Sequence, residues 1–154
     1  MSGPSAYAKQ AQHYKEQAVT TATPEEILIM LYDGAIRFLN AARKGLETGD
    51  IEKSHNNLIK TQRIITELMC SLNIEIGGEA AQNLYRLYDY LHYRLVEANL
   101  KKDVTMVDEV LGHMRSLRDT WREAIEIALR ERAGALNASA PLEREASEGR
   151  RDSA

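Results

Sequence analysis

The chain has 154 residues, of which 44% are hydrophobic and 28% are charged, and its formal net charge is −3. This length suits one domain with its own core, and the balance of side chains excludes wholesale disorder and the basic surface of a nucleic-acid-binding protein. The single cysteine, Cys70, excludes an internal disulfide, and no stretch approaches the ~18 apolar residues of a membrane span. Because the N-terminal residues also lack the apolar core of a secretory signal, we expect a cytoplasmic protein without stable membrane insertion.

The first helix has a clear start. Residues 1–21 are mostly polar without a sustained apolar period, which predicts a flexible N-terminal arm. Thr23 then suits the N-cap, Pro24 the first helical position, and Glu26 the position from which a carboxylate bonds back to the cap. Apolar residues follow at spacings of three and four as far as Gly49, which predicts a helix over about 24–48.

The second helix is predicted over about 50–72. Asp50 is a suitable cap, and Gly77-Gly78 breaks the pattern that follows it. The apolar residues of this segment recur at strict sevens, which is typical of a helical bundle: Ile51, Leu58, Ile65 and Leu72.

The third helix is predicted over about 79–102, and Asp103 caps a fourth over about 104–133. The fourth helix carries an apolar stripe: Val107, Val110, Met114, Leu117, Trp121, Ala124 and Ala128. Beyond Gly134 the composition turns to Ala, Ser, Glu and Arg, which predicts a disordered tail over 134–154.

Together these segments predict an all-α fold. Short joints make consecutive helices antiparallel neighbours, so residues 22–133 should form an up-down-up-down four-helix bundle. We find no alternating run that predicts a strand.

A di-iron centre is one alternative function for such a bundle. Glu52-Lys53-Ser54-His55 and Asp89-Tyr90-Leu91-His92 have the spacing of ferritin-like ligands. In antiparallel helices, however, Glu52 lies level with Asn99, about 15 Å along the axis from Asp89. We therefore expect no metal site and no cofactor.

A histidine phosphotransfer bundle is the other alternative, because Gly112-His113 places a small residue beside a histidine in mid-helix. Nucleophile motifs and phosphate-binding glycine loops are absent from the sequence, so we expect no catalytic residues and no enzyme.

The third helix is apolar over more than one stripe, with four tyrosines among its leucines: Tyr85, Tyr88, Tyr90 and Tyr93. A helix of this kind either packs against two neighbours or lines an external groove for an amphipathic partner helix. The sequence leaves both interpretations open.

Several segments, in order along most of the chain, resemble the FliS-type flagellin export chaperones. They are Thr21-Ala22-Thr23-Pro24-Glu25-Glu26, Met30-Leu31-Tyr32-Asp33-Gly34-Ala35, Gly77-Gly78-Glu79, Leu87-Tyr88-Asp89-Tyr90, Arg94-Leu95 with Ala98-Asn99, and Glu109-Val110 with Trp121 downstream.

The resemblance implies a four-helix bundle that binds the C-terminal helical segment of flagellin, blocks premature polymerisation and delivers its cargo to the flagellar type III export gate. It implies neither catalysis nor a cofactor, and an N-terminal arm that lies on part of the groove when flagellin is absent. A monomer or a weak homodimer is compatible with it.

Eight residues are predicted to line the flagellin groove. Tyr14 matches the tyrosine that precedes the Thr-Ala-Thr-Pro motif, and Leu31 and Leu91 also suit a plain core position. The full set is Tyr14, Met30, Leu31, Ile36, Leu84, Tyr88, Leu91 and Leu95.

Overall fold

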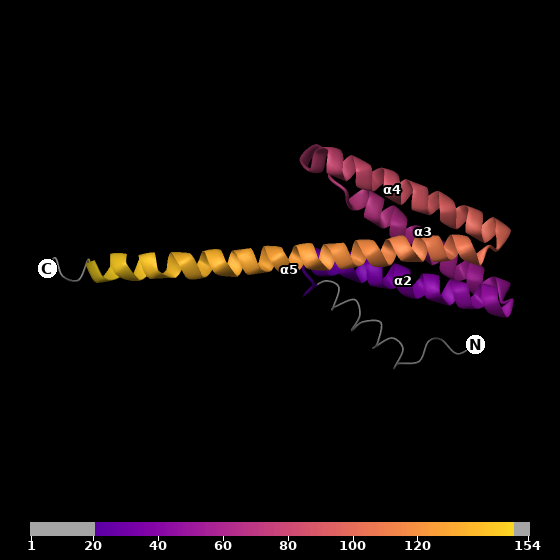
Figure 1. The fold of residues 1–154 in the computed structure, drawn as a ribbon, viewed down its shortest axis with the longest axis horizontal. Coiled ribbons are helices and arrows are strands. Elements are labelled where there is room, and N and C mark those ends of the chain that lie inside the picture. The colour runs from indigo at the N-terminus through magenta and orange to yellow at the C-terminus, as the bar shows by residue number, and fades with distance from the viewer. Residues whose placement is uncertain (1–20, 150–154) are drawn as a thin grey trace, which may run out of the picture. The chain divides into compact units, whose positions relative to one another are not determined.

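The computed structural model describes residues 21–149, which are helical almost throughout and contain no strand (Figure 1). The helices are α2 (Pro24–Thr48), α3 (Ile51–Ser71), α4 (Ile74–Lys101) and α5 (Val104–Gly149). Among the described residues, those up to Arg118 form one compact unit, and those from Asp119 onward form a second. The predicted all-α class with four helices is confirmed.

The predicted caps set the helix boundaries. The Thr23 hydroxyl accepts a hydrogen bond from the Glu26 backbone N–H at 3.2 Å, and the Asp50 carboxylate accepts one from Lys53 at 3.0 Å. Between α2 and α3, Gly49 adopts φ 73°, the left-handed conformation that a glycine tolerates best at a helix end.

Helix α4 starts earlier than the sequence predicts. Its cap is Asn73, whose side chain accepts a hydrogen bond from the Ile76 backbone N–H at 3.1 Å. A short helical turn follows and is interrupted at Gly78, with φ 56° and ψ −134°. The predicted break at Gly77-Gly78 is therefore a kink inside α4, because Asn73 caps a turn before it.

Helix α5 continues past Gly134 to Gly149, whereas the sequence predicts a disordered tail over 134–154. A single glycine costs a helix only about 1 kcal/mol relative to alanine. The same stretch contains Pro141, which has no backbone N–H to donate, so the helical range includes both a glycine and a proline.

Helices α2 and α3 run in opposite directions and pack closely. A methyl group added at Gly45 would lie 2.8 Å from the Ser54 backbone nitrogen, and one added at Gly34 would lie 3.3 Å from Ile64. The position on α3 rises as the position on α2 falls, which is the antiparallel relation expected from the short joint.

The other helices of the bundle alternate in the same way. On α3 and α4, His55 Nδ1 and Asn99 Nδ2 are 2.9 Å apart, which agrees with the predicted level of Glu52 near Asn99. On α2 and α5, Arg43 pairs with Asp108 at 2.6 Å, whereas Asp33 pairs with Arg118 at 3.4 Å. Figure 1 shows α4 and α5 meeting at their joint, with α4 running obliquely away from it.

The core fills the space between the helices. Tyr32 of α2 and Tyr88 of α4 are its largest fully buried side chains, and their hydroxyls are hydrogen bonded. The other fully enclosed apolar residues come from all four helices: Ala35, Leu39, Ala42, Leu58, Ile65, Leu68, Leu91, Leu95, Ala98, Val107, Val110 and Met114. Trp121, expected in the same seam, is half-buried, and Ala124 and Ala128 are exposed.

Candidate functional site

The eight residues predicted for the groove lie in different environments. Tyr14 lies outside the described residues. Met30 is 44% exposed on α2, and Leu31 and Leu84 are half-buried. The remaining four are buried in the core: Ile36, Tyr88, Leu91 and Leu95. Met30, Leu31 and Leu84 are thus the predicted residues that a partner can reach in the described part of the chain.

A polar cluster joins α4 to α5. The Tyr90 hydroxyl donates a hydrogen bond to Glu109 Oε1 at 2.5 Å, and Arg94 donates two to Glu109 Oε2, at 2.7 and 2.9 Å from its Nη2 and Nε. Arg94 also lies 3.6 Å from the carboxylate of Glu97. We call Tyr90, Arg94 and Glu109 the α4–α5 clasp.

The clasp favours the charged form of its carboxyl. Hydrogen bonds from Tyr90 and then from Arg94 lower the pKa of Glu109, and the charge of His113 lowers it further. The same bond to Glu109 raises the pKa of Tyr90. Both pKa shifts have the same cause: the ionised carboxylate of Glu109 accepts hydrogen bonds from the neutral Tyr90 hydroxyl and the cationic Arg94 guanidinium.

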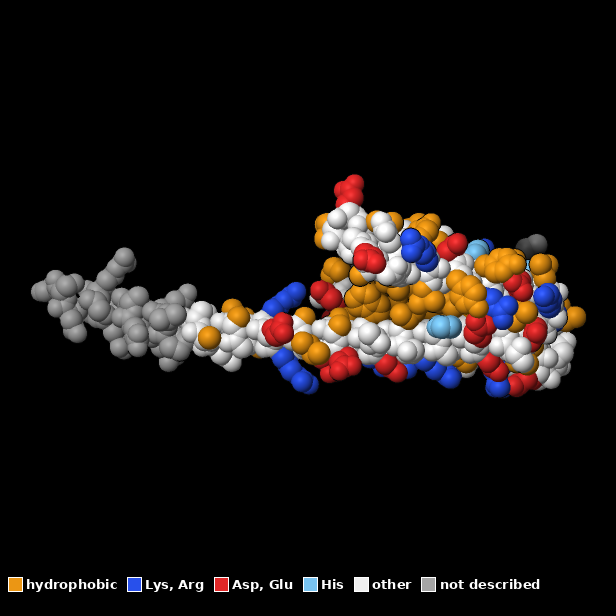
Figure 2. Space-filling view, turned by 45° about the horizontal axis from the view of Figure 1, so that its top comes forward, with side chains coloured by type: hydrophobic (Ala, Val, Ile, Leu, Met, Phe, Trp, Pro, Cys, Tyr) orange, Lys and Arg blue, Asp and Glu red, His pale blue; other side chains and the backbone are white. Residues whose placement is uncertain are grey.

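An apolar groove starts beside the clasp. The two helices are antiparallel, because only Lys102 and Asp103 separate them. One turn toward the N-terminus of α4 from Tyr90 lies Leu87, and two turns along α5 from Glu109 lies Leu117. Figure 2 shows a band of hydrophobic side chains in the hollow between α4, at the top of this view, and α5 below it.

From the helical register set by the clasp, we assign Leu84 and Leu87 to one side of the α4–α5 groove and His113 and Leu117 to the other. The three leucines are half-buried, and His113 is exposed at the rim. A long, apolar surface between two helices can accept the apolar face of a third.

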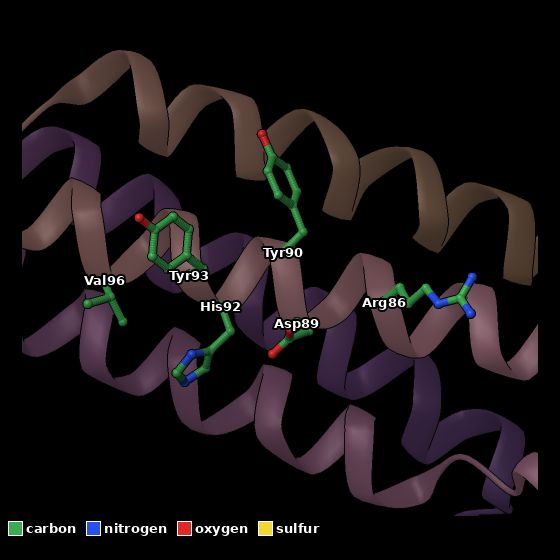
Figure 3. A pocket seen from close by; sticks show the side chains of 6 residues that line it. All are labelled: Arg86, Asp89, Tyr90, His92, Tyr93 and Val96. Carbon is green, nitrogen blue, oxygen red and sulfur yellow. The ribbon is translucent and has the colours of Figure 1, made fainter.

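The outer face of α4 has a different character. It carries a shallow hollow of about 460 Å³ lined by Arg86, Asp89, Tyr90, His92, Tyr93 and Val96. Figure 3 shows these side chains diverging: Tyr90 points toward α5, whereas His92 points toward α3. A second hollow of about 380 Å³, between α3 and α4, shares His92. Mixed charges and divergent side chains make this face unsuited to an apolar partner.

The residues weighed for metal or phosphoryl chemistry are dispersed. No three His, Cys, Asp or Glu side chains in residues 21–149 come together as a metal site. His55 is engaged with Asn99, and His92 lies on the outer face of α4. His113 is exposed at the rim of the α4–α5 groove.

Sequence reasoning missed Glu109, Leu87, His113 and Leu117 as members of one surface. Leu87 and Leu117 belong to the apolar stripes of their helices, and that periodicity is the only signal for them. The main partner of Arg94 is Glu109 on the next helix, whereas Asp89 of its own helix lies on the outer face of α4.

No helix in the described range is both long and apolar enough to cross a membrane.

Known proteins resemble the chain over most of its length. The family model described as flagellar protein FliS matches residues 7–128. The flagellar secretion chaperone FliS of Bacillus subtilis (strain 168) is 41% identical over 121 residues, which are 79% of this chain and 90% of that protein. The flagellar secretion chaperone FliS of Salmonella typhimurium (strain LT2) is 41% identical over 123 residues, covering 79% and 89% of the two chains.

A solved structure shares the fold. It is described as a flagellar chaperone from bacteria, and it superposes with a TM-score of 0.63 at 24% identity. The match covers 77% of this chain and 96% of that one. The helical bundle found here is therefore an architecture already seen in a flagellar chaperone.

Proposed function

Since the chain belongs to the FliS family of flagellar secretion chaperones, we propose that it binds the C-terminal helical segment of flagellin in the α4–α5 groove. Bound there, the segment cannot polymerise prematurely, and the complex is delivered to the flagellar type III export apparatus. The observation that carries this proposal is the apolar band between α4 and α5 (Figure 2).

The chemistry of the groove suits an amphipathic helix. Its walls present Leu84, Leu87 and Leu117, which are half-buried and can still lose water-exposed surface. Burying apolar area gives about 25 cal/mol per Å², so a helix with an apolar stripe gains most by docking there. The polymerising end of a filament protein carries such a stripe, because the same face packs against neighbours in the filament.

The clasp supports the groove from one end. Tyr90 and Arg94 of α4 hold Glu109 of α5, so the spacing of the two walls is fixed by three hydrogen bonds beside the apolar surface. A preformed site of this kind loses less conformational entropy when a partner binds.

We propose that flagellin is released by transfer to another surface and that no nucleotide hydrolysis is required. Ordering a flexible segment costs several kcal/mol, so a segment that binds through apolar contacts can be displaced by a competing surface at the export apparatus. In this scheme the chain binds, covers and transfers its partner, and it works in the cytoplasm, where new flagellin is made.

The proposal is tested by co-purification of the full chain with flagellin and with flagellin that lacks its C-terminal segment. We expect intact flagellin to be retained and the truncated form to be lost. Equal retention of both forms would contradict the proposal, because the contact would then lie elsewhere on flagellin.

A further inference from the structure

The first turn of α4 is set apart from the rest of the helix by a single residue. Residues 74–77 form this turn, which is capped by Asn73 and closed by a 2.8 Å hydrogen bond from the Gly77 N–H to the Asn73 carbonyl. Gly78 then has φ 56° and ψ −134°, and the helix resumes after it. We call residues 74–77 the entry turn. Its Ile76 is 87% exposed, more than any other large hydrophobic side chain in the described part of the chain.

The kink at the entry turn depends on two glycines. At Gly78 the dihedral angles are those of the first central residue of a type II′ turn, a position that favours glycine. At Gly77 an added β-carbon would lie 2.6 Å from the β-carbon of Ala81. In a straight α-helix, β-carbons four residues apart are separated by ~5–6 Å, and alanine is the preferred residue. Alanine at either glycine therefore opposes the kink and favours a straight helix.

The joint between α3 and α4 explains why the free chain is kinked. Within residues 21–149, positive φ occurs at Gly49, Gly78 and Lys102. Gly49 and Lys102 are the first residues of the two-residue joints that follow α2 and α4, where they help to reverse the chain. The corresponding residue after α3 is Leu72, whose φ is −72°. Positive φ is costly for a leucine, so at this joint the positive φ is found at Gly78 instead.

A straight α4 would place Ile76 in the wall of the α4–α5 groove. At 100° per residue, Ile76 and Leu87 would fall within about 20° of one another around the helix. At 1.5 Å per residue, Ile76 would lie about 12 Å beyond Leu84 along the axis. The apolar wall of the groove would thus become longer by about two helical turns.

We infer that the entry turn is a switch: when a partner helix occupies the α4–α5 groove, Gly78 becomes helical and Ile76 joins the groove wall. This inference rests on the proposed function, because the docked helix supplies the apolar contact that Ile76 lacks in the free chain. The change requires new dihedral angles at Gly78 and in the joint of Leu72 and Asn73, while the capped turn moves as one piece. Burial of Ile76 offsets the cost of positive φ at the joint.

The switch predicts the sign of a substitution effect. A ligand shifts a conformational equilibrium only when it contacts the two forms differently, and here the straight form offers one more contact. A substitution that destabilises the kinked form raises the fraction of chains in the straight form. Such a substitution therefore tightens binding of the partner, although it lies outside the leucines of the groove.

The test is titration calorimetry of the full chain with a peptide of the flagellin C-terminal segment. We expect Gly78→Ala and Gly77→Ala each to bind at least about threefold more tightly than the parent chain. Adding Ile76→Ser to Gly78→Ala should abolish the gain. The control is Gly134→Ala, which makes the same change at an exposed helical position with nothing within 4 Å, and it should bind as the parent does.

A second measurement follows Gly78 in the parent chain, so that it does not depend on the folding of any variant. The Cα and carbonyl chemical shifts of ¹³C-labelled glycine distinguish a helical backbone from a type II′ turn. We expect the signals of Gly78 to move to helical values at saturating peptide. The signals of Gly49, which ends α2 at a joint that does not change, should keep their non-helical values.

The inference is overturned if Gly78 keeps its non-helical signals in the peptide complex, because the entry turn then does not move. It is equally overturned if the two alanine variants fold, by circular dichroism, and bind no more tightly than the parent. A gain in affinity that survives Ile76→Ser shows that Ile76 is not the added contact. In all three cases the parent chain still binds the peptide, so the proposed function stands. A parent chain that binds no peptide contradicts the proposed function and the inference together.

Discussion

The hydroxyl groups of Tyr32 and Tyr88 are hydrogen bonded to each other inside the core, although 56 positions separate them in the sequence. They join α2 to α4 across the middle of the bundle, and both side chains are almost completely buried. Buried hydroxyls are costly without partners, so each of these groups depends on the other for part of its stability.

We expect Tyr32→Phe and Tyr88→Phe each to lower the free energy of unfolding by about 1–3 kcal/mol. The double variant should lose less stability than the sum of the two single losses. Each single variant leaves one buried hydroxyl without its hydrogen-bond partner, whereas the double variant removes both hydroxyls. Urea denaturation of all four proteins measures the coupling. Strictly additive losses would show that the two hydroxyls do not stabilise one another.

Substitution by alanine should lower the stability of the protein at Gly45 and raise it at Gly112. At Gly45 a methyl group would lie 2.8 Å from the Ser54 backbone nitrogen and 3.0 Å from the Asp50 carbonyl, so α2 and α3 must separate. At Gly112, an exposed position of α5, it would meet nothing within 4 Å. We expect Gly45→Ala to cost about 1–3 kcal/mol and Gly112→Ala to add up to about 1 kcal/mol.

Thermal and urea unfolding of both variants check this pair. The Gly112 variant is the control, since it applies the same chemical change where no neighbour must move. A Gly45 variant as stable as the parent would mean that the joint between α2 and α3 can widen freely.

Because of the clasp, the free energy of unfolding should decrease as the pH falls below about 4.5. The hydrogen bonds from Tyr90 and Arg94 hold the pKa of Glu109 below its ordinary value of 4.5. As the pH falls through 4.5, the unfolded chain binds a proton at Glu109 before the folded chain does, so this contribution is complete above that pH and is lost below it.

We therefore expect the parent chain to be more stable than Glu109→Gln near neutral pH, with the difference shrinking as the pH falls below about 4.5. Urea denaturation of both proteins across this range gives the difference directly and cancels the titration of other carboxyls. A difference that stays constant with pH would show that the charge of Glu109 is not stabilised by the clasp.

The sequence contains enough local information to predict the helices. Each helix cap is a local interaction, in which a side chain accepts a hydrogen bond from a backbone N–H two or three residues later. The caps are Thr23, Asp50 and Asp103. The three-and-four spacing of apolar residues also identified most of the core. The composition after Gly134 suits both disorder and an isolated helix, so composition alone does not decide between them.

The site was harder to predict because it depends on register between helices. Periodicity assigns Leu84 and Leu91 to one broad apolar face, but only the packing decides that Leu91 is buried and Leu84 remains half-exposed. Likewise Arg94 has acidic neighbours along its own helix, and its main partner, Glu109, comes from the next.

The measurement that tests the central claim most directly is the affinity of the full chain for a peptide of the flagellin C-terminal segment, by titration calorimetry. The variants are Leu87→Gln in the α4–α5 groove and Leu100→Gln, which is 81% exposed on the same helix away from the groove. We predict that the parent and Leu100→Gln bind equally, and that Leu87→Gln, checked for folding by circular dichroism, binds about tenfold more weakly or worse. Equal binding by all three proteins would contradict the assignment of the α4–α5 groove, and no binding by the parent chain would contradict the proposed function.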